Sequence, residues 1–512
     1  MDILFISPAN PKGIYQSLST KYSAIEPPTW ALLLAESCRS RGYSVGILDM
    51  HAENLSYEEA QNKINLSNPK LVCFVVYGQN VNAGTTTMSA VSKFADFLKK
   101  NNISILLSVI GSHVQALPLE TLDKEPSIDF VFTNEGVYAL HNILKLEKIN
   151  LKTIENIKGI ALRKNSIAQM NPAEKIVPQD RLDTDLPGYA WDLLPFKNKP
   201  FDLYRSPMWH ANYIEENRTP YAAIQTSIGC QFQCEFCMIN VINRNDNEPV
   251  GVSSNYNGMR YWSRDFIIKE FDKLINLGVK TIRITDEMFL LNPKYYLPLC
   301  ELLEKRNKND ELILWAYSRV DTVKRPEILK KIRKAGLKWL ALGIENADKS
   351  IRLETSKGKF DDVDIKKVVS QIHESGINVM ANYIYGLPGD NLNTIKNTFE
   401  LSKELCTLAW NTYAAMALPG SKLYKDAKEK NIKLPDSYEG FSFHSYETIN
   451  LPTQELKAAE ILKLRDDHFS EYHTQPAYLE KISKNFGQEA ANNIKKMCEI
   501  KLKRRIIEEA KI

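Results

Sequence analysis

The sequence predicts an α/β fold with two βα modules, a Rossmann-like sheet in residues 1–145 and a partial (βα)6 barrel of TIM type in residues 216–430. In both regions, apolar runs of strand length alternate with segments of helical periodicity. Such alternation implies parallel strands covered by helices. The alternation stops in residues 146–215, which we predict to be a connector. Residues 431–512 are mostly helical in pattern, and we predict a helical C-terminal extension there.

Length and composition bound the class of protein. A chain of 512 residues with 44% hydrophobic and 25% charged residues is typical of a globular protein with two to four domains. The net charge of +4 is spread along the chain and gives no case for nucleic-acid binding. No apolar run reaches the roughly 18 residues of a membrane span. The N-terminus lacks the basic region and cleavage site of a signal peptide. With scattered cysteines outside one motif, these features predict a cytoplasmic protein.

The first module contains five predicted strands, at residues 3–7, 44–49, 71–77, 103–110 and 130–133. Helices are predicted at residues 28–41 and 86–100 from their apolar periodicity. Ligands of parallel sheets bind beyond the carboxyl ends of the strands. The candidate binding residues at those ends are Tyr77, Gln79, Gly111, Ser112, His113 and Glu135.

The connector has two parts. Residues 160–163 and 167–169 can pair as a small hairpin. The rest is rich in proline and aromatic residues, and it is too apolar for a free linker. We therefore expect it to lie across both modules.

The second module contains six predicted strands, at residues 222–226, 281–285, 312–317, 339–343, 379–385 and 412–417. Between them, Ser263 is a candidate helix N-cap, Pro326 begins a helix, and Gly376 ends another. Six βα units are six of the eight units of a full barrel, and barrel chemistry lies at the carboxyl ends of the strands.

Three cysteines follow the first barrel strand at the spacing C-x3-C-x2-C: Cys230, Cys234 and Cys237. Three thiolates can hold three irons of a [4Fe–4S] cluster. No fourth cysteine stands at a matching spacing, so the fourth iron would be open, and an open metal position is typical of catalytic sites. The alternative is a zinc knuckle. Structural zinc needs four ligands, usually in two pairs, and His210 and His373 do not form such a pair.

This motif, with the aromatic Phe236 before its last cysteine, resembles the radical S-adenosylmethionine (radical SAM) superfamily. The resemblance implies that the open iron chelates S-adenosylmethionine, which one electron cleaves to a 5′-deoxyadenosyl radical. It also implies an electron donor such as flavodoxin or ferredoxin. Further positions beyond successive strands match the family's S-adenosylmethionine-contacting segments: Asp286, Glu287, Arg319 and Glu345.

The first module resembles the cobalamin-binding domain found before many radical SAM barrels. The matching pieces are Glu26-Pro27-Pro28, Gly111-Ser112-His113 and Asn134-Glu135-Gly136. The loop after the first strand lacks the Asp-x-His-x-x-Gly motif of proteins that ligate cobalt from below. If cobalamin binds, its lower face is expected to lack a histidine ligand. The alternative is a Rossmann-like domain without a cofactor.

The C-terminal segment 441–447 mixes aromatic and polar residues and could cover the barrel mouth. Within it, His444 and Tyr446 are candidate acceptors of a substrate proton.

The resemblance implies a cobalamin-dependent C-methyltransferase acting on a small molecule. Three alternatives remain: radical oxidative cyclisation or rearrangement, radical SAM chemistry without cobalamin, and a cobalamin-sensing regulatory protein.

Overall fold

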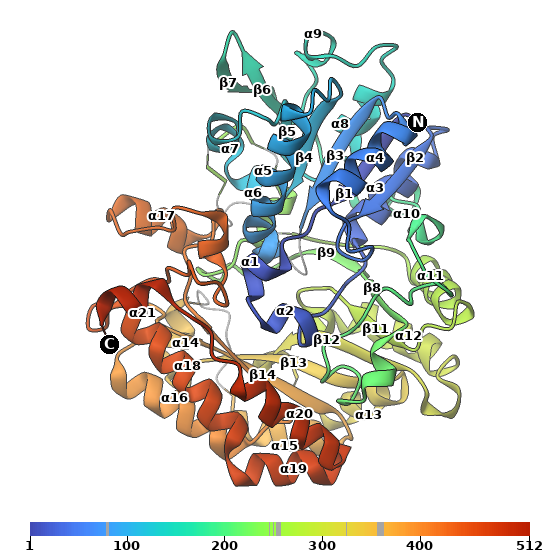
Figure 1. Cartoon of the computed structure of the whole chain (residues 1–512). Coiled ribbons are helices and arrows are strands. Elements are labelled where there is room, and N and C mark those ends of the chain that lie inside the picture. The colour runs from blue at the N-terminus through green and yellow to red at the C-terminus, as the bar shows by residue number, and fades with distance from the viewer. Residues whose placement is uncertain are drawn as a thin grey trace.

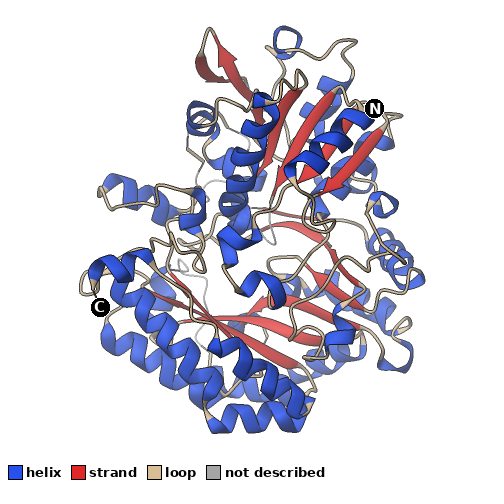
Figure 2. Ribbon diagram, viewed as in Figure 1, coloured by secondary structure: helices blue, strands red, loops and turns tan. Residues whose placement is uncertain are grey.

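The computed structural model describes residues 1–77, 81–244, 246–248, 250–251, 258–323, 325–355 and 363–511. Two sheets stand one above the other, and the carboxyl ends of the parallel strands of the upper sheet face the lower sheet (Figure 1). The C-terminal helices lie against the lower sheet, far from the upper one (Figure 2). The predicted α/β class, with a Rossmann-like module, a six-stranded barrel and a helical C-terminal region, is confirmed.

The upper sheet has seven strands in the order β2-β1-β3-β4-β5-β6-β7. Its parallel part consists of β1 (Ile3–Ser7), β2 (Val45–Asp49), β3 (Leu71–Val76), β4 (Leu106–Gly111) and β5 (Phe130–Phe132). The hairpin predicted within the connector is formed by β6 (Ile160–Lys164) and β7 (Ile167–Met170). It joins this sheet as an antiparallel edge, because β6 pairs with β5.

Helices cover both faces of this sheet, as expected when parallel strands are buried on both sides. They are α3 (Thr29–Arg39), α4 (Tyr57–Ser67), α5 (Gly84–Lys100), α6 (Ser112–Ala116), α7 (Pro118–Lys124) and α8 (Val137–Leu144). The short helices α1 (Pro11–Tyr15) and α2 (Leu18–Lys21) lie below the sheet, on the side of the lower sheet (Figure 1), and α9 (Leu151–Ile154) follows α8. Every residue of β3 is buried. A short turn, η1 (Val81–Ala83), precedes α5.

The aromatic part of the connector follows α10 (Leu182–Asp185) and packs on both modules. The Tyr204 hydroxyl donates to Asp49 at the end of β2, at 3.0 Å. The Trp191 indole donates to Glu270 of the barrel, at 2.9 Å. Because it is bonded to each side, this segment fixes how the two modules face each other.

The lower sheet contains six parallel strands in the order β15-β14-β13-β12-β11-β8. They are β8 (Tyr221–Ile224), β11 (Thr281–Ile284), β12 (Ile313–Arg319), β13 (Leu337–Glu345), β14 (Asn378–Tyr385) and β15 (Ala409–Ala414). The helices between and after them are α11 (Arg264–Asn276), α12 (Pro293–Glu304), α13 (Pro326–Lys334), α14 (Lys349–Thr355), α15 (Ile365–Glu374), α16 (Leu392–Leu405) and α17 (Lys422–Glu429). One ribbon was not predicted: β9 (Ser227–Cys230) pairs antiparallel with β10 (Gly258–Tyr261).

The C-terminal region contains α18 (Ala458–Thr474), α19 (Pro476–Phe486), α20 (Gln488–Glu499) and α21 (Arg505–Ala510). Lys501, Lys503 and Arg504 precede α21, in a segment without regular secondary structure. Arg504 is buried there and pairs with Asp466 at 2.8 Å. Among the residues that the structure describes, no helix combines the length and apolar character needed to span a bilayer.

Candidate functional site

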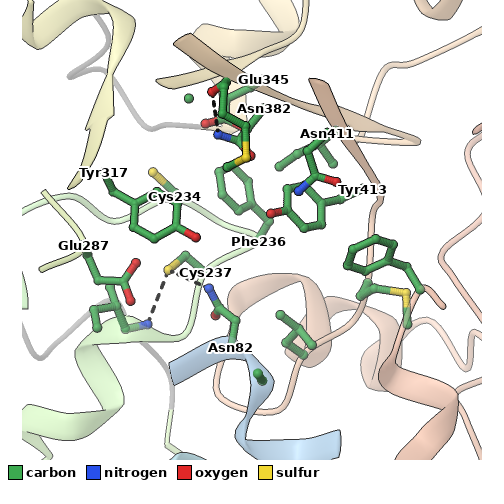
Figure 3. Close-up of a pocket in the computed structure, with 18 of the residues that line it drawn as sticks. Asn82, Cys234, Phe236, Cys237, Glu287, Tyr317, Glu345, Asn382, Asn411 and Tyr413 are labelled. Atoms are coloured by element: carbon green, nitrogen blue, oxygen red, sulfur yellow. Dashed lines mark hydrogen bonds between the residues drawn. The ribbon is translucent and has the colours of Figure 1, made fainter. Parts of the chain in front are cut away.

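A cavity of about 440 Å³ lies where the carboxyl ends of both sheets meet. Its walls come from four parts of the chain that are far apart in sequence: α1 and η1 of the upper module, the connector, the barrel, and the segment after α17. Figure 3 shows its central part, with Cys234 and Cys237 beside Glu287 and Tyr317. Ligand sites of both parallel sheets and barrels are expected at such ends.

All three motif cysteines line this cavity. The Sγ of Cys237 accepts hydrogen bonds from the Ile239 amide, at 3.4 Å, and from the Asn82 side chain, at 3.7 Å (Figure 3). The Sγ of Cys230 accepts one from the Phe232 amide, at 3.5 Å. Hydrogen bonds to sulfur stabilise cluster-bound thiolates and tune their reduction potential.

Burial raises the pKa of Cys230 to about 12 and that of Cys237 well above its ordinary value. Both thiols are therefore protonated without a metal, and metal binding must displace their protons. Within the described part of the chain, no three His, Cys, Asp or Glu side chains are arranged to hold one ion. The three thiolates of a cuboidal cluster each bind a different iron, so they need not converge on one point. The cysteines thus fit a [4Fe–4S] cluster better than a single zinc ion.

Asp286 supports the loop that carries the cysteines. Its carboxylate accepts hydrogen bonds from the Thr226 amide and hydroxyl and from the Ser227 hydroxyl, each at 2.6 Å. These bonds fix the turn between β8 and β9. Asp286, which the family resemblance makes a candidate cofactor ligand, does not line the cavity. Its buried carboxylate is fully engaged within the protein.

The other predicted barrel residues do reach the cavity: Phe236, Glu287, Arg319 and Glu345. The Arg319 guanidinium lies 3.6 Å from the centre of the Phe232 ring and pairs with Asp321. Burial raises the pKa of Glu287 to about 7 and that of Glu345 to about 7. An arginine and two carboxyl groups beside the cysteines could bind the carboxylate and ammonium groups of an amino acid moiety.

Glu345 stands at an irregular position, because the pairing of β13 with β14 shifts between Gly343 and Glu345. Its φ of 66° is unusual for a residue with a side chain. Such backbone strain clusters at functional sites, where it directs a side chain into the site.

The raised pKa of Glu345 predicts a pH-dependent stability. The unfolded side chain titrates near 4.5 and the folded one near 7, so the folded state holds the proton more tightly. The free energy of unfolding should therefore fall as pH rises from 4.5 to 7, by roughly 3 kcal/mol for this group. Glu345→Gln should match the wild type at pH 4.5 and exceed its stability at pH 8. Urea unfolding at both values tests this, with the exposed Glu304→Gln as control. An equal difference at both pH values would refute the assignment.

The predicted residues of the upper module lie elsewhere. Glu135 is fully buried and pairs with Arg260 of β10 at 2.8 Å. The Ser112 hydroxyl donates to the Val81 carbonyl at 2.6 Å. A side chain on Gly111 would meet the Val76 carbonyl oxygen at 2.3 Å, so this glycine permits close packing of β4 on β3. All three residues therefore make contacts within the protein.

Tyr77 and His113 also do not line this cavity. The Tyr77 hydroxyl accepts a hydrogen bond from Gln115 at 2.5 Å. His113 shares a hydrogen bond with Thr85, at 3.1 Å, and packs edge-on against Tyr438. Gln79 lies outside the described residues. The upper module instead presents Ile14, Tyr15, Glu26, Asn82, Ala83 and Thr86 to the cavity.

The structure separates the two C-terminal candidates. His444 lines the cavity beside Tyr15, with a ring-centroid distance of 5.3 Å. Burial and the nearby Arg465 and Arg504 hold its pKa well below the ordinary value, so the imidazole is neutral. Tyr446 is 37% exposed and its hydroxyl donates to Glu508 of α21, at 2.8 Å. The structure therefore does not bring Tyr446 to the cavity.

Sequence reasoning missed the residues inside the barrel. Arg283 and Trp315 line the cavity from β11 and β12, and Asn382 and Asn411 line it from β14 and β15. The alternation of side chains along a strand could have indicated the inward set, since it places residues 315, 317 and 319 on one face. Glu26, which belongs to a segment that carries the family resemblance, and His210 come from loops, and no periodic signal marks them as cavity residues.

The residues of one cavity wall fit cobalamin. The wall contributed by η1 and α5 is made of small or short side chains, Asn82, Ala83 and Thr86, and it faces the cysteine loop directly. A flat macrocycle could lie on such a wall. The cavity histidines among the described residues, His210 and His444, come from the connector and the C-terminal segment. The loop after β1 contributes none, in agreement with the missing motif there.

Comparison with known proteins identifies both modules. Residues 16–144 match the family model "B12 binding domain", and residues 224–402 match "Radical SAM superfamily". An uncharacterized methyltransferase of Pyrococcus horikoshii is 24% identical, over 94% of each chain. The anaerobic magnesium-protoporphyrin IX monomethyl ester cyclase of Cereibacter sphaeroides is 24% identical, over 92% of this chain and 70% of the relative.

A similar fold is found in a solved structure of TsrM from Kitasatospora setae, a radical S-adenosylmethionine methyltransferase with cobalamin and a [4Fe–4S] cluster bound. The TM-score is 0.64, at 14% identity, over 98% of this chain and 99% of that one. At this identity the likeness shows a shared fold. The two family models add that the cofactors are a [4Fe–4S] cluster, S-adenosylmethionine and cobalamin. Residues 224–402 therefore form a radical SAM domain, and residues 16–144 form a B12-binding domain.

Proposed function

We propose that this protein is a cobalamin-dependent radical SAM enzyme that methylates an unactivated carbon of a small molecule. One observation carries the proposal. The three cysteines and the carboxyl-end face of the B12-binding domain line the same cavity, and Asn82 of that domain touches Cys237 directly. A single substrate in this cavity can therefore be within reach of both cofactors.

The bound cofactors would supply a 5′-deoxyadenosyl radical and a transferable methyl group. Cys230, Cys234 and Cys237 would hold the cluster. Glu287, Arg319 and Glu345 would bind the amino acid part of S-adenosylmethionine, since they provide one cation and two titratable carboxyls on one wall. The surrounding buried side chains exclude water from the reacting groups.

If methylation also releases a substrate proton, His444 is the candidate acceptor; the hydrogen atom that the radical removes leaves in 5′-deoxyadenosine and needs no base. The His444 imidazole is neutral and lines the cavity, so it can take up a proton without first losing one.

An electron donor such as flavodoxin or ferredoxin would reduce the cluster, and a reducing cytoplasm would suit the cluster. The eight cysteines, all within the described ranges, form no disulfide, which supports that location.

The test is anaerobic reconstitution with cobalamin, S-adenosylmethionine and a reductant. A methylase should form 5′-deoxyadenosine and S-adenosylhomocysteine together, because one S-adenosylmethionine yields the radical and another yields the methyl group. The product should gain one CH2. Formation of neither compound by protein with an intact cluster would refute the proposal.

Oxidative cyclisation is the second candidate function. It is favoured by the similarity to the cyclase of Cereibacter sphaeroides, which extends over 92% of this chain. A cyclase would form 5′-deoxyadenosine without S-adenosylhomocysteine, and its product would lose hydrogen. The same experiment therefore separates the two functions.

A further inference from the structure

The cavity extends from the cysteines into the interior of the barrel, where Arg283 of β11 lines it. This arginine is 2% exposed. Its Nη1 donates to both carboxylate oxygens of Glu26, at 2.7 and 2.6 Å. The guanidinium carbon lies 4.8 Å from the centre of the Trp315 ring and 5.4 Å from that of Tyr317. The ion pair and the two rings hold the guanidinium in one orientation.

One edge of this guanidinium has no hydrogen-bond partner among the residues that the structure describes. The Nε and Nη2 atoms are buried and make no hydrogen bond within the described part of the chain. A buried donor without an acceptor costs about 1–3 kcal/mol. These two atoms form the edge of a guanidinium that binds two acceptor oxygens side by side. Because Arg283 lines the cavity, this unpaired edge, called the open edge below, indicates a ligand with oxygen acceptors.

His210 offers a second unsatisfied group in the same part of the cavity. Its ring lies 4.0 Å from that of Trp315, and neither ring nitrogen has a hydrogen-bond partner among the described residues. Burial and the charges of Arg283 and Arg218 hold its pKa well below the ordinary value. The neutral ring presents one donor and one acceptor.

The walls near these groups are flat and aromatic. Trp209 packs edge-on against Trp315, with a centroid distance of 5.0 Å, and both line the cavity. On the far strands, Asn382 and Asn411 are paired in register, and the Oδ1 of Asn382 is buried without a partner in the described chain. Apolar walls with few polar groups are typical of small-molecule sites.

Glu26 already neutralises the charge of Arg283, so the open edge does not require an anion. It requires oxygen lone pairs: a carboxylate offers two oxygens side by side, and a neutral carbonyl offers two lone pairs on one oxygen. The aromatic walls favour a conjugated ring beside that oxygen group.

We propose that the open edge of Arg283, with His210 and the Trp315 wall, binds a carboxylate or carbonyl group borne by a flat conjugated ring of the substrate. This inference deepens the proposed function, because it places the non-reacting end of the substrate in the barrel and the reacting carbon toward the cysteines. The binding itself requires neither the cluster nor turnover.

The test uses the purified full chain, with and without reconstituted cluster, and three ring compounds of similar size: benzoate, benzamide and toluene. Saturation-transfer NMR measures their affinities. We expect the two oxygen-bearing compounds to bind more tightly than toluene. Arg283→Lys keeps a cation beside Glu26 but removes the two-atom edge. It should weaken benzoate and benzamide binding about tenfold and leave toluene binding unchanged.

Two further variants are measured in the same way. His210→Phe leaves the Arg283–Glu26 pair intact and should weaken the binding of benzoate and benzamide. It therefore provides the test if Arg283→Lys does not fold. Arg333→Lys, on the outer helix α13, should change nothing. Equal binding of toluene and benzoate by the wild type, or an unchanged preference in both cavity variants, would overturn the inference. Binding that is lost in these variants while no methylation is ever seen would refute only the proposed function.

Discussion

Replacing Cys237 with alanine is expected to abolish the cuboidal cluster and, with it, formation of 5′-deoxyadenosine, a loss of at least about 10³-fold. Cys237 is the cysteine that accepts hydrogen bonds from both the cysteine loop and the B12-binding domain. Two remaining thiolates cannot hold three irons. Iron and sulfide content, together with electron paramagnetic resonance of the reduced protein, measures the outcome.

The matched control is Cys300→Ala. Cys300 is 2% exposed in α12 and does not line the cavity. Its replacement should cost about 1 kcal/mol of stability from lost packing and leave the cluster unchanged. A full complement of iron and sulfide in Cys237→Ala would show that the motif does not hold the cluster. A loss in both variants would indicate a folding defect instead.

Most of the fold could be predicted from the sequence, because strands and helices are marked by patterns of neighbouring residues. Each barrel strand is an apolar run bounded by turn residues, and all six appear within a few residues of their predicted bounds. The β9–β10 ribbon was missed because β10 is short and half-exposed, and its partner β9 is contiguous with the predicted strand at β8. The cysteine motif is equally local, so its position at the cavity followed from the strand before it.

Which of the predicted site residues reach the cavity depends on contacts that are not local in sequence. Glu287 and Asp286 are adjacent carboxylates after the same strand, yet only Glu287 lines the cavity. What distinguishes them is Thr226 and Ser227, 60 and 59 positions away in sequence, which bind the Asp286 carboxylate. Likewise, Tyr446 is two residues from His444 but is held outside by Glu508. Partners so distant in the chain leave no periodic or spacing signal.

Glu135→Leu is expected to destabilise the protein by about 3–5 kcal/mol, because it leaves the Arg260 charge buried without its counter-ion. The two side chains are 0% and 8% exposed. Arg260 keeps its bonds to the Val177 carbonyl, at 2.6 Å, and to Asn243, at 2.8 Å, but these do not neutralise it. The pair joins the end of β5 to β10, beside the cysteine loop, so its loss should loosen the contact between the two modules.

The double variant Glu135→Leu with Arg260→Met removes both charges and should recover most of the lost stability. The control is Lys366→Met, which breaks an exposed pair with Glu404 and should cost less than about 1 kcal/mol. Urea unfolding gives the stabilities, and a cobalamin absorbance titration is run on each folded variant. If Glu135 contacted cobalamin, its replacement would lower cobalamin affinity while stability stayed near that of the wild type. A buried ion pair predicts a different result. The single variant should lose much of its stability. The double variant, whose upper module keeps its packing, should bind cobalamin with near-normal affinity.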